Sequence, residues 1–136
     1  MSAIAARGIV DGTAKGPALV GAEPISFLGD VDIRTGRVVG DLPSLRNTSV
    51  KGTVLIFPYT RGSAGAWRFL YQLYKHANAP VAIVTQTVPD PSVVQGAILA
   101  RIPIACEPQA DLAALVQNGA PVLVEVKNGK AVIRLT

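Results

Sequence analysis

The chain has 136 residues, of which 49% are hydrophobic, 5% aromatic and 16% charged, with a formal charge of +4 and one cysteine. This length fits one domain with an aliphatic core, the single cysteine excludes an internal disulfide, and no apolar run approaches the ~18 residues of a transmembrane helix. The single cysteine favours a cytoplasmic setting, and the lack of a long apolar run argues against a membrane protein. The basic residues are scattered without interleaved aromatics, so we expect no binding to nucleic acid.

The first third of the sequence is rich in glycine and turn residues. Short strands are predicted in residues 3–12 and 16–23, where glycines separate the apolar residues. The Arg-Thr-Gly sequence at 34–36 is typical of a turn tip and lies between two extended pieces, 30–33 and 37–40. This part of the chain therefore contributes strands and loops.

The rest of the sequence alternates between apolar runs of strand length and helical patterns. In residues 64–76 the apolar side chains recur with helical spacing, which predicts an amphipathic helix that buries Trp67, Leu70, Tyr71 and Tyr74. The predicted strands are residues 52–59, 80–86 and 101–107, and the predicted helices are residues 64–76, 90–100 and 108–119.

The last 16 residues predict a β-hairpin, because Asn128-Gly129 is a typical two-residue turn between two alternating segments. Together the elements predict a single α/β domain over residues 1–136 with a mixed sheet. Its N-terminal half is β-rich, βαβ units with right-handed crossovers follow, and a hairpin closes the chain. The extra β pieces indicate an additional layer or a barrel-like flank.

The most informative stretch is the turn between the strand at 52–59 and the helix at 64–76. It reads Arg61-Gly62-Ser63-Ala64-Gly65. A helix start presents free backbone N–H groups and partial positive charge, and glycines let a ligand approach the backbone closely. Arg61 adds a fork of donors suited to carboxylate or phosphate. We therefore expect Arg61, Gly62, Ala64 and Gly65 to bind a small anionic substrate.

Ser63 lies among these donors and is the candidate catalytic residue. A serine hydroxyl can act as a base only if N–H groups and a cation stabilise its alkoxide, as in an oxyanion hole. Such a serine can remove a proton from a carbon next to a carboxylate. The alternative is that Ser63 caps the helix, which stabilises a helix by about 1 kcal/mol. The only histidine, His76, falls at the far end of the helix and predicts no serine–histidine pair.

Several motifs occur in a familiar order: GTAKGPALVGAEPISFLGDVDIRTGRVV, VLIFPYTRGSAG, APVAIV and GAILARIPI. Together they resemble the small subunit, or swivelling domain, of the aconitase X family, from about Gly8 to Ile104. The resemblance implies a hydro-lyase in which a large subunit carries an iron–sulfur cluster. A small swivelling subunit closes over it and supplies the serine of the Gly-Ser turn, here Ser63, as the base.

The resemblance also implies a substrate class. Archaeal two-subunit members dehydrate (R)-5-phosphomevalonate to trans-anhydromevalonate 5-phosphate in a mevalonate pathway to isoprenoids, and related bacterial members dehydrate cis-3-hydroxy-L-proline. The form Ser-Phe-Leu-Gly at 26–29 and the separate short chain are more similar to the archaeal enzyme. Many members have His-Pro where this chain has Leu42-Pro43, and a second hydroxyl residue where it has Ala64, so Ser63 has no neighbouring hydroxyl to share its role.

The chain has no set of thiolates that would hold an iron–sulfur cluster, because Cys106 stands alone. We expect Cys106 to be a buried core thiol. The cluster would therefore belong to a large catalytic subunit, and the chain itself would bind no metal. The charged fraction is below the usual ~25%, which fits a surface covered by that partner in a heterodimer.

Three function classes remain open from the sequence. The first is an enzyme subunit with Ser63 as proton acceptor, acting on phosphomevalonate or on cis-3-hydroxy-L-proline. The second is a non-catalytic module that binds a phosphorylated metabolite at the same turn, and the third is a purely structural subunit. Ser26 and Asp30 are weaker site candidates, since loops often use Ser and Asp for local backbone hydrogen bonds.

Overall fold

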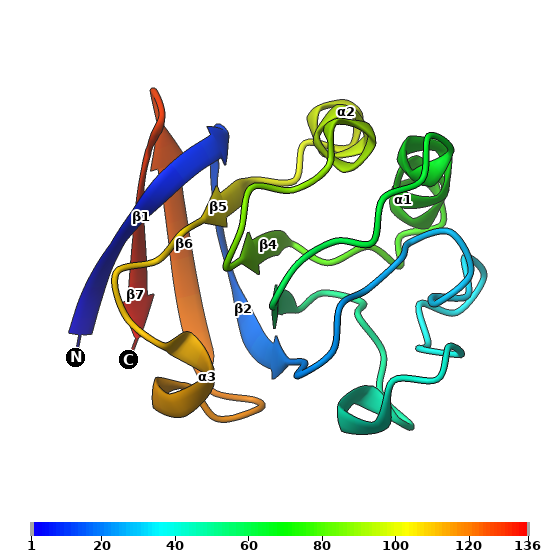
Figure 1. The fold of residues 1–136 in the computed structure, drawn as a ribbon, viewed down its shortest axis with the longest axis horizontal. Coiled ribbons are helices and arrows are strands. Elements are labelled where there is room, and N and C mark those ends of the chain that lie inside the picture. The colour runs from blue at the N-terminus through cyan, green and yellow to red at the C-terminus, as the bar shows by residue number, and fades with distance from the viewer. Residues whose placement is uncertain (1, 136) are drawn as a thin grey trace.

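A computed structural model describes residues 2–135 and shows a closed β-barrel with helices beside it (Figure 1). The strands are β1 (Ser2–Val10), β2 (Gly12–Val20), β3 (Val54–Phe57), β4 (Ala82–Thr85), β5 (Ile104–Cys106), β6 (Pro121–Lys127) and β7 (Lys130–Leu135). The helices are the 3₁₀ turn η1 (Pro43–Leu45), α1 (Ala66–Lys75), α2 (Pro91–Ala100) and the short α3 (Leu112–Leu115).

The strand order around the barrel is β1-β5-β4-β3-β2-β6-β7, and β7 pairs with β1 to close it. Strands β2, β3, β4 and β5 run parallel, while β1, β6 and β7 make antiparallel pairs. The predicted fold class is therefore confirmed, with a mixed sheet, βαβ units and a C-terminal hairpin. The barrel-like flank of the prediction is the sheet itself, which closes on its own edge.

Strands β3, β4 and β5 are buried on both faces, and all their residues are apolar except Thr85 at the end of β4. In β3, Val54 and Ile56 point into the barrel, where they pack with residues of β6 and β7. Leu55 and Phe57 point the other way and pack beneath α1 and α2. The barrel thus has one core inside it and a second core between its β3–β5 side and the helices.

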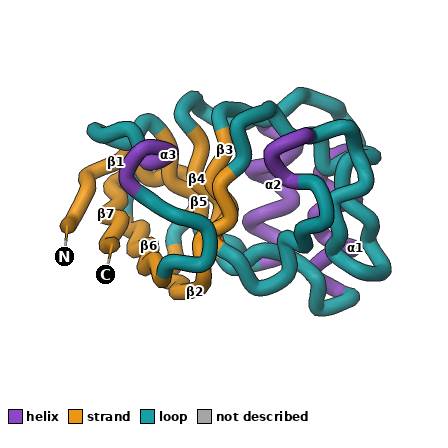
Figure 2. Tube along the Cα trace, turned by 90° about the horizontal axis from the view of Figure 1, so that it is seen from below, coloured by secondary structure: helices purple, strands orange, loops and turns teal. Residues whose placement is uncertain are grey.

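Helices α1 and α2 pack against each other on that outer face, and Figure 2 shows them at the opposite end of the molecule from β1, β6 and β7. The predicted helix from 64 to 76 is confirmed as α1, but its buried face is different. The side chains of Ala66, Leu70 and Leu73 are buried, whereas Tyr74 is 42% exposed. The prediction for Tyr74 was wrong because the true stripe lies one residue earlier along the helix.

Two further predictions need correction. The third helix was expected over 108–119, but α3 spans only Leu112–Leu115, and extended backbone and turns make up the rest. The extended pieces around the Arg-Thr-Gly turn pair at a single bridge, Val31 with Val38.

No helix within residues 2–135 is long and apolar enough to cross a membrane.

Candidate functional site

The Arg-Gly-Ser turn lies at the carboxyl end of β3 and leads directly into α1. In sheets with parallel strands, loops at this end of the strands commonly bind ligands. The loop that starts at Ile25 runs beside the turn, because Ile25 forms a parallel bridge with Thr60 and its carbonyl accepts the N–H of Arg61 at 2.9 Å. Two segments of the chain therefore meet at the turn.

Three consecutive backbone N–H groups in the turn have no acceptor among residues 2–135. They belong to Gly62, Ser63 and Ala64, and the residues around them are exposed or half-buried. By contrast, the N–H of Gly65 donates to Ser63 Oγ. Consecutive free N–H groups attract anions, an effect that the start of α1 strengthens.

Ser63 is half-buried and is not the N-cap of α1. That position is held by Gly65, and no cap-residue side chain bonds the helix. The Ser63 hydroxyl oxygen accepts only the N–H of Gly65, at the long distance of 3.3 Å. Its own proton has no acceptor within the described chain, so the hydroxyl is held weakly and remains available to a ligand.

Arg61 extends from the turn to Asp30, with 2.9 Å between Arg61 Nη2 and Asp30 Oδ2. The Arg61 side chain is 54% exposed and that of Asp30 only 10%. The same carboxylate oxygen accepts the N–H of Ser26 at 2.8 Å. Asp30 thus fixes one end of the Arg61 guanidinium and leaves its other donors open to solvent.

A second guanidinium near Ser63 was not singled out from the sequence. Arg68, on the first turn of α1, is exposed. However, a β-carbon placed on Gly65 would lie 3.5 Å from Arg68 Nη2 and 4.0 Å from Ser63 Oγ. Both side chains therefore lie beside Gly65. Among the described residues Arg68 has no ion-pair partner. The signal in the sequence was that Arg68 follows Ser63 by five positions, at the start of the helix.

The weaker candidates differ in their surroundings. Ser26 Oγ donates to the carbonyl of Leu28 at 3.1 Å, which is the local backbone bonding expected for a loop serine. Asp30 does more, because it joins its own loop to Arg61 across the turn. Leu42 is buried with 4% exposure and packs in the outer core.

The start of α2 forms the other wall of the site. Asp90 and Ser92 both hydrogen-bond to the segment around Ser63, although they lie about 30 positions later in the sequence. Between the two segments is a shallow depression of about 400 Å³, lined by Gly62, Ser63, Ala64, Asp90, Pro91, Ser92 and Gln95. The sequence signalled only that Asp90-Pro91 starts a helix.

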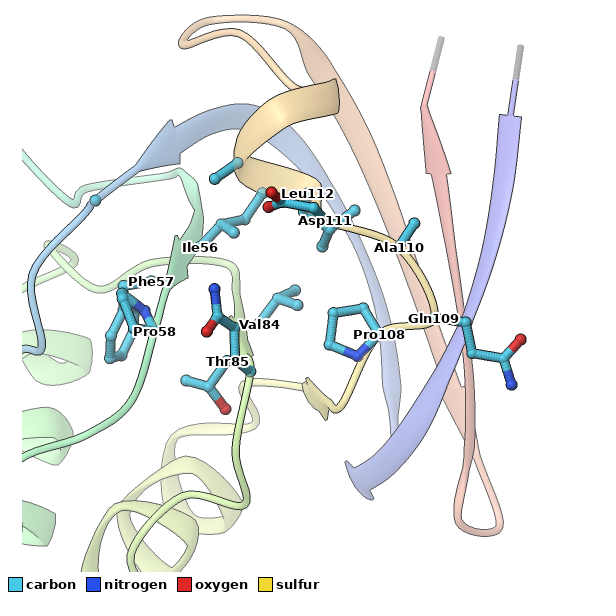
Figure 3. Close-up of a pocket in the computed structure, with 13 residues that line it drawn as sticks. Ile56, Phe57, Pro58, Val84, Thr85, Pro108, Gln109, Ala110, Asp111 and Leu112 are labelled. Atoms are coloured by element: carbon cyan, nitrogen blue, oxygen red, sulfur yellow. The ribbon is translucent and has the colours of Figure 1, made fainter.

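A deeper pocket of about 390 Å³ lies elsewhere, between β3, β4 and the chain leading into α3 (Figure 3). Its labelled lining is mainly apolar, including Ile56, Val84 and Pro108, with Asp111 and Thr85 as polar members. The Thr85 hydroxyl is already bonded to the carbonyl of Thr87 at 2.7 Å. Ser63 and Arg61 do not line this pocket, and of these two residues Ser63 lines the shallower depression.

The described residues do not fit an iron–sulfur cluster. Cys106 is fully buried in β5, and burial raises the pKa of its thiol, an effect that the nearby Glu107 increases and Arg7 opposes. No group of three or more His, Cys, Asp or Glu side chains within residues 2–135 is arranged to hold a metal ion. His76 is the C-cap of α1, at the opposite end of that helix from the Ser63 turn.

Comparisons with known proteins give the family. The sequence model of the aconitase X swivel domain matches residues 3–135. The chain is 39% identical to the phosphomevalonate dehydratase small subunit of Methanothermobacter thermautotrophicus over 91% of this chain and 94% of that protein. It is 42% identical to the subunit of the same name from Methanosarcina mazei, over 90% and 85%.

A solved structure agrees with these sequence matches. The chain aligns with the crystal structure of Thermococcus kodakaraensis aconitase X in its holo-form with a TM-score of 0.86 and 32% identity, covering 98% of this chain and 99% of that chain. The sequence motifs, the barrel with its flanking helices and the serine-bearing turn therefore lead to one conclusion. The chain belongs to the aconitase X swivel domain family.

Proposed function

We propose that this chain is the small subunit of a two-subunit hydro-lyase that dehydrates (R)-5-phosphomevalonate to trans-anhydromevalonate 5-phosphate in a mevalonate pathway. The names of its archaeal relatives support this substrate. The observation that carries the chemistry is the surroundings of Ser63. The backbone N–H groups of residues 62–64 have no acceptor within the described chain, and Arg61 and Arg68 are nearby. The whole of residues 1–136 acts as one swivelling domain.

Ser63 is the proton acceptor in this proposal. Its alkoxide takes a proton from the substrate carbon next to the carboxylate, the electron pair of that C–H bond forms the new double bond, and the hydroxyl group leaves the neighbouring carbon. The proton taken by Ser63 and the departing hydroxide together make the water that is released, which returns Ser63 to its alkoxide form. The free N–H groups and the guanidiniums stabilise the alkoxide before the reaction and the substrate's negative charge throughout. A positioned base of this kind contributes roughly 10²- to 10⁴-fold to a rate.

The partner is a larger catalytic subunit, as the designation of the relatives as small subunits suggests. Because the described residues here offer no cluster ligands, the iron–sulfur cluster belongs to that subunit. The substrate is anionic at its carboxylate and phosphate, and Arg61 with the N–H groups of residues 62–64 binds one of these groups. We place the heterodimer in the cytoplasm, in keeping with the single free cysteine.

The experiment is anaerobic co-expression with the larger subunit, followed by a dehydration assay. (R)-5-phosphomevalonate and cis-3-hydroxy-L-proline are offered separately, and the products are identified by mass spectrometry. We expect turnover of phosphomevalonate alone. Turnover of hydroxyproline alone would assign the chain to the other branch of the family. Binding of phosphomevalonate without turnover of either compound, by a complex with its cluster intact, would indicate a non-catalytic binding module.

A further inference from the structure

We propose that Asp90 and Ser92, at the start of α2, are positioning residues that hold Ser63 and its free N–H groups in the reactive arrangement. This inference rests on the proposed function, because it explains what holds the Ser63 turn in the geometry that the proposed reaction needs. It is carried by four contacts between α2 and the turn. Two of them lie on the β3 side of Ser63 and two on the α1 side.

The first contact is a reciprocal pair of hydrogen bonds before Ser63. The hydroxyl of Thr60 donates to Asp90 Oδ2 at 2.6 Å, and the same hydroxyl accepts the N–H of Asp90 at 3.0 Å. Thr60 is 8% exposed and Asp90 is half-buried, so these bonds are partly shielded from water. Two bonds between one pair of residues fix both the position and the direction of the chain as it enters the turn.

The second contact is the close approach of Gly62 to the carboxylate of Asp90. A β-carbon at Gly62 would lie 2.9 Å from Asp90 Oδ1 and 3.1 Å from Oδ2. A β-carbon at these distances would have to displace the Asp90 carboxylate, which its bonds with Thr60 hold in place, and Gly62 has no positive φ that would itself call for glycine. The carboxylate therefore packs directly against the residue that precedes Ser63.

The third contact, made by Ser92, and the fourth, made by Gly96, both involve residues that lie after Ser63. Ser92 Oγ accepts the N–H of Trp67 at 3.0 Å and donates to the carbonyl of Ala64 at 3.0 Å. Ser92 thus caps the start of α1 from α2. Gly65, the N-cap residue, has no side chain with which to do so. At Gly96 of α2, a β-carbon would lie 2.9 Å from the Cα of Trp67, so the two helices are in close contact at this level.

These contacts fix both ends of a turn whose own internal bonds are few. Within the turn, Ser63 makes only the long bond from the Gly65 N–H and a backbone bond to Ala66. The direction of the free N–H groups and of the Ser63 hydroxyl is therefore set by α2. A displacement of about 1 Å at a reacting group can cost roughly 10²-fold in rate.

The test compares variants of the assembled two-subunit enzyme. Thr60→Val keeps the shape of the side chain but removes both bonds to Asp90, and Ser92→Ala removes both bonds on the other side. We expect kcat to fall by about 10- to 100-fold in each, with KM changed far less. Thr60→Ser, which retains the hydroxyl, should restore most of kcat. The matched control is Thr35→Val, which breaks the 3.2 Å bond from Thr35 to Asp32 on a distant exposed turn.

A double-mutant cycle tests the Gly62 contact separately. Gly62→Ala should lower kcat strongly beside Asp90, and much less in an Asp90→Ser background, where the carboxylate is gone. The two substitutions are in contact, so their effects should be non-additive. Equal effects of Gly62→Ala in both backgrounds would show that Asp90 does not constrain Gly62.

A readout without catalysis separates this inference from the proposed function. In NMR relaxation measurements on the full chain, the amides of Gly62, Ser63 and Ala64 should be more mobile in Thr60→Val and Ser92→Ala than in the wild type. Unchanged mobility in both variants would overturn the inference, even if Ser63→Ala abolishes turnover. If Ser63→Ala is fully active while mobility increases, the proton-acceptor role proposed for Ser63 fails, whereas Asp90 and Ser92 still fix the geometry of the turn.

Discussion

Arg61 Nη2 lies 2.9 Å from Asp30 Oδ2 and joins two loops that are 31 positions apart in the sequence. Because the same oxygen also accepts the Ser26 N–H, the Asp30 carboxylate is held in place independently of Arg61. The guanidinium is thereby oriented at the edge of the Ser63 turn while more than half of its side chain stays open to solvent. This arrangement suits a residue that binds an anion arriving from outside.

Replacing Arg61 with alanine should therefore impair substrate binding more than folding. Arg61 is half-exposed, and the Asp30 carboxylate keeps the Ser26 N–H as a donor when Arg61 is removed, so the melting temperature should change by only a few degrees. Loss of a charged hydrogen bond to substrate costs about 1.5–3 kcal/mol, which corresponds to a roughly 10- to 100-fold higher KM. Steady-state kinetics of the complex measure this. Arg46→Ala, which breaks another exposed ion pair at 3.6 Å to Asp41, is the control and should leave KM unchanged.

Gly40→Ala should destabilise the fold by displacing Asp30. Gly40 has no positive φ, but a β-carbon there would collide with Asp30 Oδ1. Gly119→Ala is the comparison, because Gly119 has a φ of 86° with open space around it and would suffer backbone strain alone. Chemical denaturation should show the larger loss for Gly40→Ala. A smaller loss would mean that the Asp30 side chain relocates freely.

The buried face of α1 can be tested by comparing neighbouring residues. Leu73 is fully buried, whereas Tyr74 is 42% exposed. Leu73→Ala should lower the free energy of unfolding by about 2–5 kcal/mol, the usual range for a core leucine. Tyr74→Ala should have a much smaller effect. Urea denaturation of both variants provides the measurement, and the opposite ranking would contradict the packing described for α1.

Cys106 should make stability depend on alkaline pH. Burial, with help from Glu107, raises the thiol pKa above its ordinary value of 9.0. Above about pH 9 the unfolded chain loses this proton while the folded chain keeps it, so the free energy of unfolding falls as pH rises. Below that pH the contribution is fully present. Denaturation from pH 7 to 10 should show a steeper alkaline decline for the wild type than for Cys106→Ala, and parallel profiles would disagree with a raised pKa.

The sequence predicted the order and type of most elements because local patterns determine them. Strands β3, β4 and β5 are short runs that are apolar except for Thr85, and Asn128-Gly129 specifies the final hairpin turn. Closure of the barrel was not predictable in this way. It depends on β1 pairing with β5 on one side and β7 on the other, which are contacts between residues about 100 positions apart for β5 and about 130 positions apart for β7.

The residues of the candidate site also fall into those that local sequence predicts and those that only the fold brings together. Ser63 and its flanking glycines stand out in the sequence because their chemistry is contained in five consecutive residues. The partners that organise them do not, since Asp30, Asp90 and Ser92 reach the turn only through the folded chain. The helix-cap interpretation of Ser63 was reasonable for a serine at a helix start, but the helix begins two residues later than that interpretation required.

The most direct measurement of the central claim is hydrogen exchange at the substrate carbon next to the carboxylate. The assembled enzyme is incubated with (R)-5-phosphomevalonate in D₂O, and deuterium in recovered substrate and product is followed by NMR for the wild type and Ser63→Ala. If Ser63 is the proton acceptor, the variant should assemble normally and bind substrate, yet lose both exchange and dehydration by roughly 10²- to 10⁴-fold. Exchange and turnover at the wild-type rate in Ser63→Ala would show that another group takes the proton.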